Sequence, residues 1–120
     1  MIFDKRSPVY EQIIEMHKQK IVSGAFQPGQ EIPSRRELAT QLKVNPNTVQ
    51  RSYSDLEREG ILLSQRGVGS FVVEDAELFE NLRKEMAREI VNSFIEDMKK
   101  LGMPRDKSIL LIEESWVNDD

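Results

Sequence analysis

Apolar residues recur at every third or fourth position near the start of the chain, from residue 10 to residue 21. Ser7 and Pro8 stand just before this pattern; serine is a frequent helix cap, and proline suits the first helical position. The spacing predicts a helix that begins at Ser7-Pro8 and ends with Gly24 as its C-cap. Its apolar stripe consists of Tyr10, Ile13, Ile14, His17 and Ile21. A metal site at His17 would need partners, and no second histidine exists, so we interpret this side chain as packed and hydrogen-bonded.

Two short apolar periods follow, each preceded by a helix cap. Ser34 and Glu37 have the S-x-x-E spacing of a capping box, in which each side chain satisfies a backbone amide near the other. Asn45 caps the next period, with Pro46 at its first position. The predicted buried faces are Leu38, Ala39 and Leu42, then Val49, Tyr53 and Leu56. Two short helices joined this tightly form a helix-turn-helix.

Glycines mark the turns between the short β-prone runs. Pro28 and Gly29 stand where a type II turn places them, and a short extended piece follows. Gly60 ends the third helix, and residues 61–73 contain two β-prone runs around Gly67 and Gly69, which predicts a β-hairpin. Three helices and then a hairpin is the order of a winged helix-turn-helix domain. We therefore expect a mainly α-helical chain, with this domain over residues 1–75.

The last part of the chain, residues 76–120, has a helical pattern of its own. A long helix is predicted over residues 76–101, ended by Gly102 and Pro104, and a second helix is predicted from about residue 104 to 116. Two helices cannot bury their apolar faces alone. These faces either pack back on the winged domain or meet a second copy of the chain, and we favour the second copy, because two-fold pairing commonly buries such a surplus. The expected dimer interface contains Leu82, Met86, Ile90, Val91, Phe94, Met98, Leu101, Ile109, Ile112 and Trp116.

The charge distribution changes the interpretation of the net charge of −4. Residues 1–75 carry ten basic and ten acidic residues, whereas residues 76–120 carry seven and eleven, so the acidity belongs to the tail. Residues 34–54 are locally basic, with a net charge of +3. The chain has no cysteine, no secretory apolar stretch and no apolar run long enough for a bilayer, which predicts a cytoplasmic protein without a membrane partner.

Arg35 and Arg36 occupy the first turn of the second helix, where the helix macrodipole disfavours cations by about 0.3 to 1 kcal/mol each. An external anion would complete such a site, and two guanidinium groups at a helix N-terminus suit a phosphate. The alternative is that they are solvated surface arginines whose charge Glu37 offsets.

The start of the third helix carries polar side chains off its buried face. In a helix-turn-helix this turn points into the major groove, where asparagine and glutamine can pair with adenine edges. Asn45 is largely committed to the cap, which leaves Asn47, Thr48, Gln50 and Arg51 to meet bases or phosphates. Exposed polar residues on a helix can also serve solubility alone. At the hairpin turn, Arg66 and Gly67 are placed to approach a minor groove.

These motifs together resemble the DNA-binding domain of GntR-type bacterial transcription regulators. The resemblance rests on "PG…IPSRRELA", "VNPNTV", "LEREG" and "GVGSFV" at their spacings, and the short two-helix tail resembles the YtrA-type subfamily. It implies a phosphate contact by Arg36. It also implies DNA contacts by Asn45, Asn47, Thr48, Gln50 and Gly67.

Three positions depart from the family pattern. Many members have arginine where this chain has Pro46 and Gln50, so the family's base preference does not carry over. Lys43 stands where helix-turn-helix turns commonly have glycine, and a left-handed conformation would cost a non-glycine residue about 1 to 2 kcal/mol. We therefore expect a turn of different geometry.

The resulting hypothesis is a homodimeric transcription regulator that binds double-stranded DNA at an inverted repeat. The resemblance implies a repressor and suggests a transporter operon as its target. The tail alone is too short to enclose a small-molecule effector unless the dimer interface supplies walls, so the sequence identifies no effector. The alternative is a winged domain used for protein–protein contact, which the negative net charge would suit. An enzyme is disfavoured, and no catalytic residue, cofactor or metal is expected, because the partners of common nucleophilic and metal sites are missing.

Overall fold

The computed structural model describes residues 3–117. The chain forms two compact units: the first runs to Leu82, and the second begins at Arg83. The division falls inside the long helix α4 (Ala76–Lys100), whose first two turns belong to the first unit. Each unit is described by itself.

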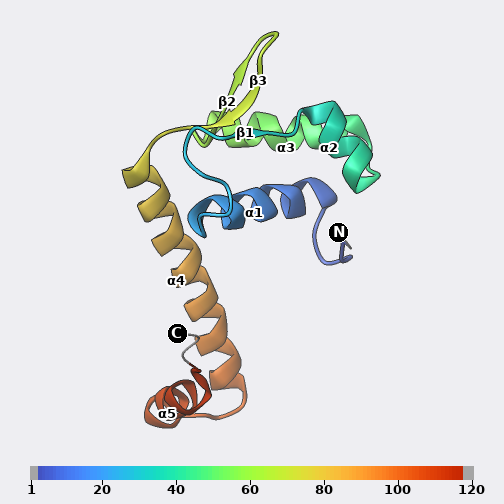
Figure 1. Ribbon diagram of the computed structural model, residues 1–120. Coiled ribbons are helices and arrows are strands. Elements are labelled where there is room, and N and C mark those ends of the chain that lie inside the picture. Colours follow the sequence, from blue (N-terminus) through green and yellow to red (C-terminus); the bar gives the residue numbers. More distant parts are fainter. Residues whose placement is uncertain (1–2, 118–120) are drawn as a thin grey trace. The chain divides into compact units, whose positions relative to one another are not determined.

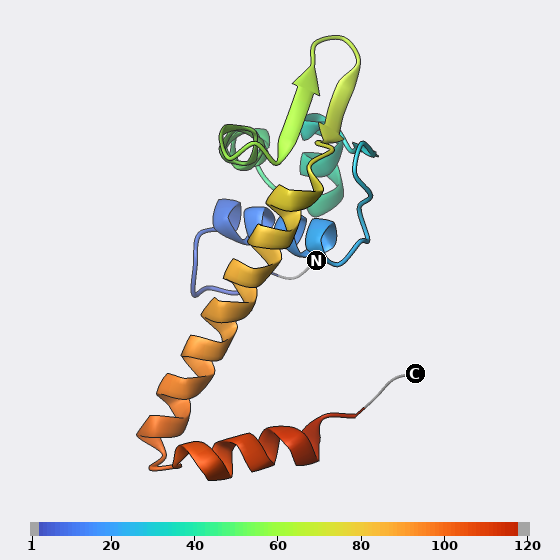
Figure 2. The ribbon, with the colours of Figure 1, turned by 90° about the vertical axis from the view of Figure 1, so that its left-hand side faces the viewer.

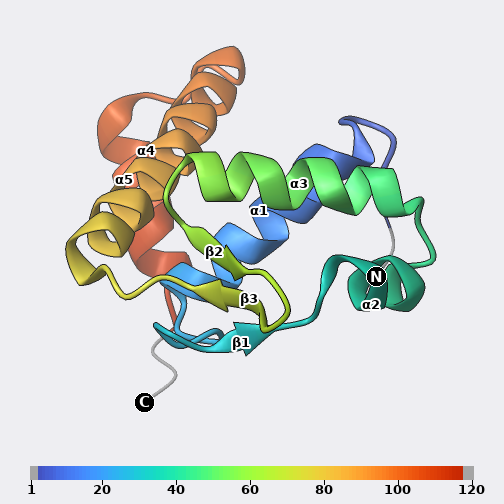
Figure 3. The ribbon, with the colours of Figure 1, turned by 90° about the horizontal axis from the view of Figure 1, so that it is seen from above.

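Three helices build the core of the first unit: α1 (Val9–Val22), α2 (Arg35–Leu42) and α3 (Pro46–Arg58). Both α1 and α2 pack against α3, and Figure 3 shows α1 and α3 lying alongside each other. The predicted apolar faces meet in this packing. Fully or almost fully buried side chains are Ile13, Ile21, Leu38, Ala39, Val49, Tyr53 and Leu56.

The capping predictions are confirmed for two helices and wrong for the first. The Ser34 Oγ accepts a hydrogen bond from the Glu37 backbone amide at 3.1 Å, and the Glu37 carboxylate accepts one from the Ser34 backbone amide at 3.4 Å. The Asn45 Oδ1 accepts the Asn47 amide at 2.8 Å, with Pro46 as the first helical residue. In α1, however, Pro8 is the N-cap and no side chain caps the helix. The Ser7 carbonyl instead accepts a hydrogen bond from the Gln12 side-chain amide at 2.8 Å.

The turn between α2 and α3 keeps the left-handed conformation despite its lysine. Lys43 has φ 56° and ψ 47°, and it is the only residue other than glycine with positive φ in the described part of the chain. The Val44 amide reaches back to the Ala39 carbonyl at 3.1 Å, which closes the end of α2. The expectation of a different turn geometry at Lys43 is therefore wrong. The hydrogen bond from Val44 to Ala39 helps to hold the left-handed conformation at some cost in backbone strain.

A three-stranded antiparallel sheet completes the first unit, in the order β1-β3-β2. The predicted hairpin is β2 (Leu62–Gln65) and β3 (Gly69–Val72), and it projects from the helices as the wing (Figure 1). The predicted turn at Pro28-Gly29 leads into β1 (Glu31–Ile32), which pairs with β3. The sequence predicted the extended piece but not its pairing with β3, which connects the turn region to the wing.

The predicted buried role of His17 is confirmed. His17 is 1% exposed, and its Nδ1 donates to the Ile13 carbonyl at 2.7 Å. Its ring meets the Tyr53 ring edge-on, with 5.4 Å between centroids. Burial lowers the pKa of His17, because it disfavours the charged ring.

The second unit contains the rest of α4 and helix α5 (Arg105–Ser115). Both helices agree with the sequence prediction to within about a residue at each end. Figure 2 shows α5 leading away from the end of α4 after the turn at Gly102, which has φ 72°. Among the helices of residues 3–117, none combines the length and apolar character needed to cross a membrane.

Candidate nucleic-acid interface

The N-terminus of α2 and the wing border one hollow, of about 440 Å³. Ser34, Arg35 and Arg36 line it from the helix, and residues 64–70 line it from the hairpin. Arg36 is exposed, and its guanidinium has no hydrogen bond or ion pair to any residue in the described range. A cation at the positive end of a helix, beside a polar hollow, is placed to meet an external anion.

Arg35 lies in the same hollow but is engaged inside the protein. Its guanidinium donates to the Glu57 carboxylate at 2.7 Å and to the Ser64 hydroxyl at 3.1 Å. It also lies over the Tyr53 ring, 5.3 Å from the centroid, and its side chain is 26% exposed. The position of Arg35 at the start of α2 is thus explained by Glu57, without an external phosphate. The two adjacent arginines have different environments, which the sequence interpretation did not separate.

The start of α3 presents its polar side chains as expected. Asn45, Asn47 and Gln50 are exposed, and Thr48 is half-buried. Gln50 makes one weak hydrogen bond, from its amide to the Ser54 hydroxyl at 3.3 Å. The side-chain amide of Asn47 has no hydrogen-bond partner within residues 3–117, so its donor and acceptor groups are free to meet an outside partner.

Arg51 has a partner that sequence analysis missed. Its guanidinium stacks on the Tyr10 ring, 3.6 Å from the centroid, and donates to the Tyr10 hydroxyl at 2.9 Å. The backbone of Tyr10 is held in turn, because its carbonyl accepts from Ser52 at 2.9 Å. Residues 8–10 line a second hollow, of about 360 Å³, together with Asn45, Asn47, Thr48 and Arg51. Tyr10 lies on the predicted apolar stripe, so only its hydroxyl hinted at a polar role.

The wing tip is exposed to solvent. Arg66 is exposed, Gly67 adopts φ 78°, and Val68 is 62% exposed. The tip is closed by the Val68 amide, which donates to the Gln65 carbonyl at 2.9 Å. The glycine supplies a conformation that side-chain-bearing residues rarely adopt, so the backbone itself is presented at the tip.

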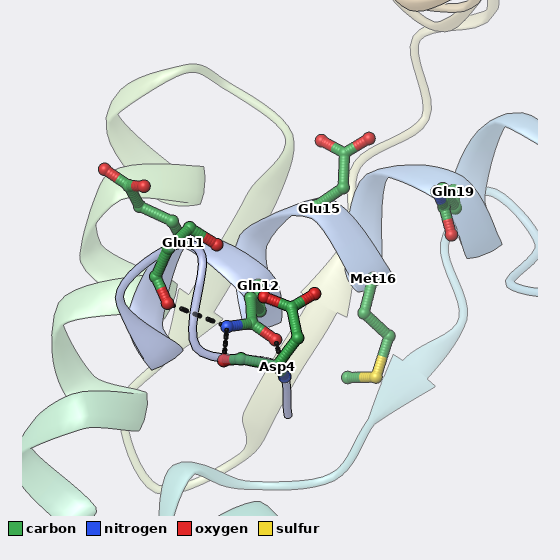
Figure 4. Close-up of a pocket in the computed structure, with 7 residues that line it drawn as sticks. Asp4, Glu11, Gln12, Glu15, Met16 and Gln19 are labelled. Carbon is green, nitrogen blue, oxygen red and sulfur yellow. Dashed lines mark hydrogen bonds between the residues drawn. The ribbon is translucent and has the colours of Figure 1, made fainter. Parts of the chain in front are cut away.

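A third hollow is lined by acidic residues, whereas arginines line the other two. Its volume is about 530 Å³, and Figure 4 shows it between α1 and the segment before it. Gln12 joins the two by hydrogen bonds to the Asp4 and Ser7 carbonyls, at 2.9 and 2.8 Å. Asp4, Glu11 and Glu15 place carboxylates around it. These would repel a phosphate backbone, which makes this hollow unsuitable for nucleic acid and leaves α2, α3 and the wing as the candidate surface.

The family model described as "Bacterial regulatory proteins, gntR family" matches residues 9–72, which contain every element of this surface. The chain belongs to the GntR family. It is 42% identical over 108 residues to the HTH-type transcriptional repressor YtrA of Bacillus subtilis (strain 168), covering 87% of this chain and 82% of that protein. The resemblance to YtrA-type GntR regulators is thereby confirmed. The GntR regulators control transcription and are not enzymes.

Solved structures agree with this assignment. A GntR family transcriptional regulator from Listeria monocytogenes superposes with a TM-score of 0.88 at 38% identity, covering 95% of this chain and all of that one. The DNA-binding domain of AraR, solved in complex with operator ORX1, matches with a TM-score of 0.56 at 32% identity; the match covers 60% of this chain and 93% of that domain. The winged helix-turn-helix prediction is confirmed, and this chain is a GntR-family transcription regulator with a DNA-binding domain.

Proposed function

We propose that this GntR regulator is a homodimeric repressor that binds an inverted-repeat operator through two winged domains. One observation carries the proposal: Arg36, the first turn of α3 and the wing tip all present exposed polar or cationic groups, and the Arg36 guanidinium and Asn47 amide lack partners in the described part of the chain. Exposed groups without a partner inside the protein are free to contact phosphates or base edges of DNA.

The exposed groups divide by chemistry into two kinds of DNA contact. Arg36 and Arg66 are charges suited to the phosphate backbone, which fixes the position of the protein but carries no sequence information. Asn47 and Gln50 can both donate to and accept from a base edge in the major groove. Arg51 is held by Tyr10 at the edge of α3, so we assign it to a backbone phosphate. Asn45 and Thr48, at the start of α3, are assigned to the DNA phosphate backbone. The exposed protein backbone at Gly67 is assigned to the minor groove.

The dimer is proposed to form through the second unit, because its apolar surface is large and exposed. Ile90 is 70% exposed and Trp116 is 75% exposed. The other exposed apolar residues of the tail are Val91, Ile95, Leu101, Ile109, Leu110, Leu111, Ile112 and Val117, while Met86, Phe94 and Met98 are half-buried. Leu82 differs from the rest of the expected interface: at 9% exposure it is already buried in the first unit, so we leave it out.

Repression and the target follow from resemblance. The YtrA relative is named a transcriptional repressor, and a protein bound to a promoter can block the access of RNA polymerase to it. We extend the proposal to a transporter operon on the same YtrA-type resemblance.

Protection mapping on the promoter upstream of the protein's own gene tests the proposal. The expected footprint has two related half-sites in inverted orientation, with centres about 10 base pairs or a multiple apart. A single unpaired half-site would contradict the dimer. No protection at any protein concentration that saturates related regulators would contradict DNA binding at this promoter.

A further inference from the structure

Arg35 is the centre of a polar cluster that joins four elements, α2, α3, β2 and β3, at the base of the wing. The cluster contains Arg35 of α2, Glu57 of α3, Ser64 of β2 and Ser70 of β3. Arg35 donates to both Glu57 and Ser64, and the Ser64 hydroxyl donates to Glu57. Because the single proton of Ser64 is used in this way, the Ser70 hydroxyl, 3.2 Å from it, acts as donor to Ser64.

Most of the cluster packs against the core and is partly shielded from solvent. The Arg35 and Glu57 side chains are 26% and 30% exposed, Ser70 is buried, and Ser64 is exposed at the edge of the cluster. The Arg35 Nε is buried without a partner in the described residues, and the guanidinium lies over Tyr53, whose hydroxyl donates to the Pro33 carbonyl at 2.6 Å. A charge-assisted pair in this setting is stronger and more directional than an exposed one.

The cluster lies where the third strand of the sheet ends and the two-stranded part of the wing begins. Ser64 and Ser70 are directly paired across the hairpin, and Ser70 is also the last residue of β3 toward the tip that pairs with β1. Beyond this pair the hairpin is two strands only, with Gln65 opposite Gly69 and then the turn. Two-stranded hairpins are marginally stable alone, so their lateral attachment matters. The cluster attaches this one to α2 and α3 at the point where the third strand stops.

We propose that Arg35 and Glu57 are positioning residues that hold the wing at the spacing from α3 at which both engage one duplex. The inference rests on the proposed DNA-binding function and adds a role for two residues that need not touch DNA. Arg35 was expected to bind phosphate; here it acts through Ser64 on the strand that leads to Arg66. A wing released from the cluster must be ordered on binding, which weakens its contribution to affinity.

A double-mutant cycle tests the inference on the full chain, with the operator duplex as the probe. Glu57→Gln keeps the size and one acceptor but removes the ion pair. Arg66→Ala should lower the affinity for the operator in both backgrounds. Its fold-loss should be on the order of ten times smaller in the Glu57→Gln background than in the wild type, because the wing no longer engages the DNA fully. The loss caused by Asn47→Ala should stay the same in both backgrounds, because α3 is unaffected.

Asp55→Asn provides the matched control. It also neutralises a carboxylate of α3 that pairs with an arginine, Arg58, at 3.0 Å, but among the described residues this pair has no hydrogen bond or ion pair to the wing. It should leave both cycles additive. Amide hydrogen exchange in the free proteins provides a readout without DNA: residues 66–69 should exchange faster in Glu57→Gln than in the wild type or in Asp55→Asn.

The outcomes separate the inference from the function on which it rests. If the wild type binds the operator while the Glu57→Gln and Arg66→Ala effects are additive, the inference is overturned and the proposed function stands. Unchanged exchange of the wing amides in Glu57→Gln would overturn it as well. If the wild type binds no duplex better than a scrambled one, the proposed function falls, whatever the exchange data show.

Discussion

Lys43 has a left-handed backbone conformation, which residues with a Cβ rarely adopt. A left-handed conformation costs a residue with a Cβ about 1 to 2 kcal/mol, whereas glycine adopts it freely but loses more entropy on folding. We expect Lys43→Gly to raise the free energy of unfolding by about 0.5 to 1 kcal/mol, measured by urea denaturation. Lys43→Ala is the control, since it removes the charge and keeps the Cβ. A destabilised Lys43→Gly variant would show that the lysine side chain stabilises the turn.

His17 should make stability depend on pH. Burial holds its folded pKa below the usual 6.5, so the unfolded state takes up the proton first. Its contribution is then fully present above about pH 6.5 and is lost as the pH falls, with a slope of at most about 1.4 kcal/mol per pH unit. Urea denaturation between pH 7.5 and 5.5 measures this slope.

His17→Gln is the comparison for that slope. The variant cannot titrate, so its free energy of unfolding should vary less between pH 6.5 and 5.5, even if it is lower throughout. Equal pH dependence in both proteins would mean that other groups cause it.

At the scale of elements, the tail helices make the clearest prediction. Ile90 lies in the middle of α4 with 70% of its side chain exposed, so Ile90→Asp should not disturb the fold of a single chain. In a dimer the same change would bury an unpaired carboxylate at the seam, which costs several kcal/mol and shifts a micromolar dimer to monomer. Sedimentation velocity measures this shift.

Asn92→Asp is the control for the tail, since it adds the same charge two residues away, at another exposed position. It should remain dimeric. If Ile90→Asp also stays dimeric at low micromolar concentration, the partner surface lies elsewhere than on this face of α4.

Local signals made the elements predictable, and distance along the chain limited the rest. The capping box at Ser34 and the cap at Asn45 use residues two or three positions apart, so the sequence displays them directly. The contacts that were missed join distant residues: Arg35 to Glu57 spans 22 positions, and Arg51 to Tyr10 spans 41. The sequence shows that Arg35, Arg36 and Arg51 are cations. Only the packing of α2 and α1 on α3 determines that Arg35 and Arg51 have partners within the described residues while Arg36 has none.

For the whole molecule, we propose that DNA recognition divides between phosphate contacts, which position the protein, and base contacts, which read the sequence. Arg36 is exposed beside the hollow between α2 and the wing, and Asn47 is exposed at the first turn of α3. A phosphate contact should contribute equally on any sequence and depend on salt, because it releases counterions. A base contact should matter on the operator only.

The most direct test is a salt titration of the wild type, Arg36→Ala and Asn47→Ala on operator and scrambled duplexes. Arg36→Ala should weaken both duplexes by similar factors and lower the salt slope by about one unit per lost phosphate contact, or about two in a dimer. Asn47→Ala should cost about 1 to 3 kcal/mol per half-site on the operator and leave scrambled DNA unaffected. Equal losses on both duplexes for Asn47→Ala, or no change for either variant, would contradict the account.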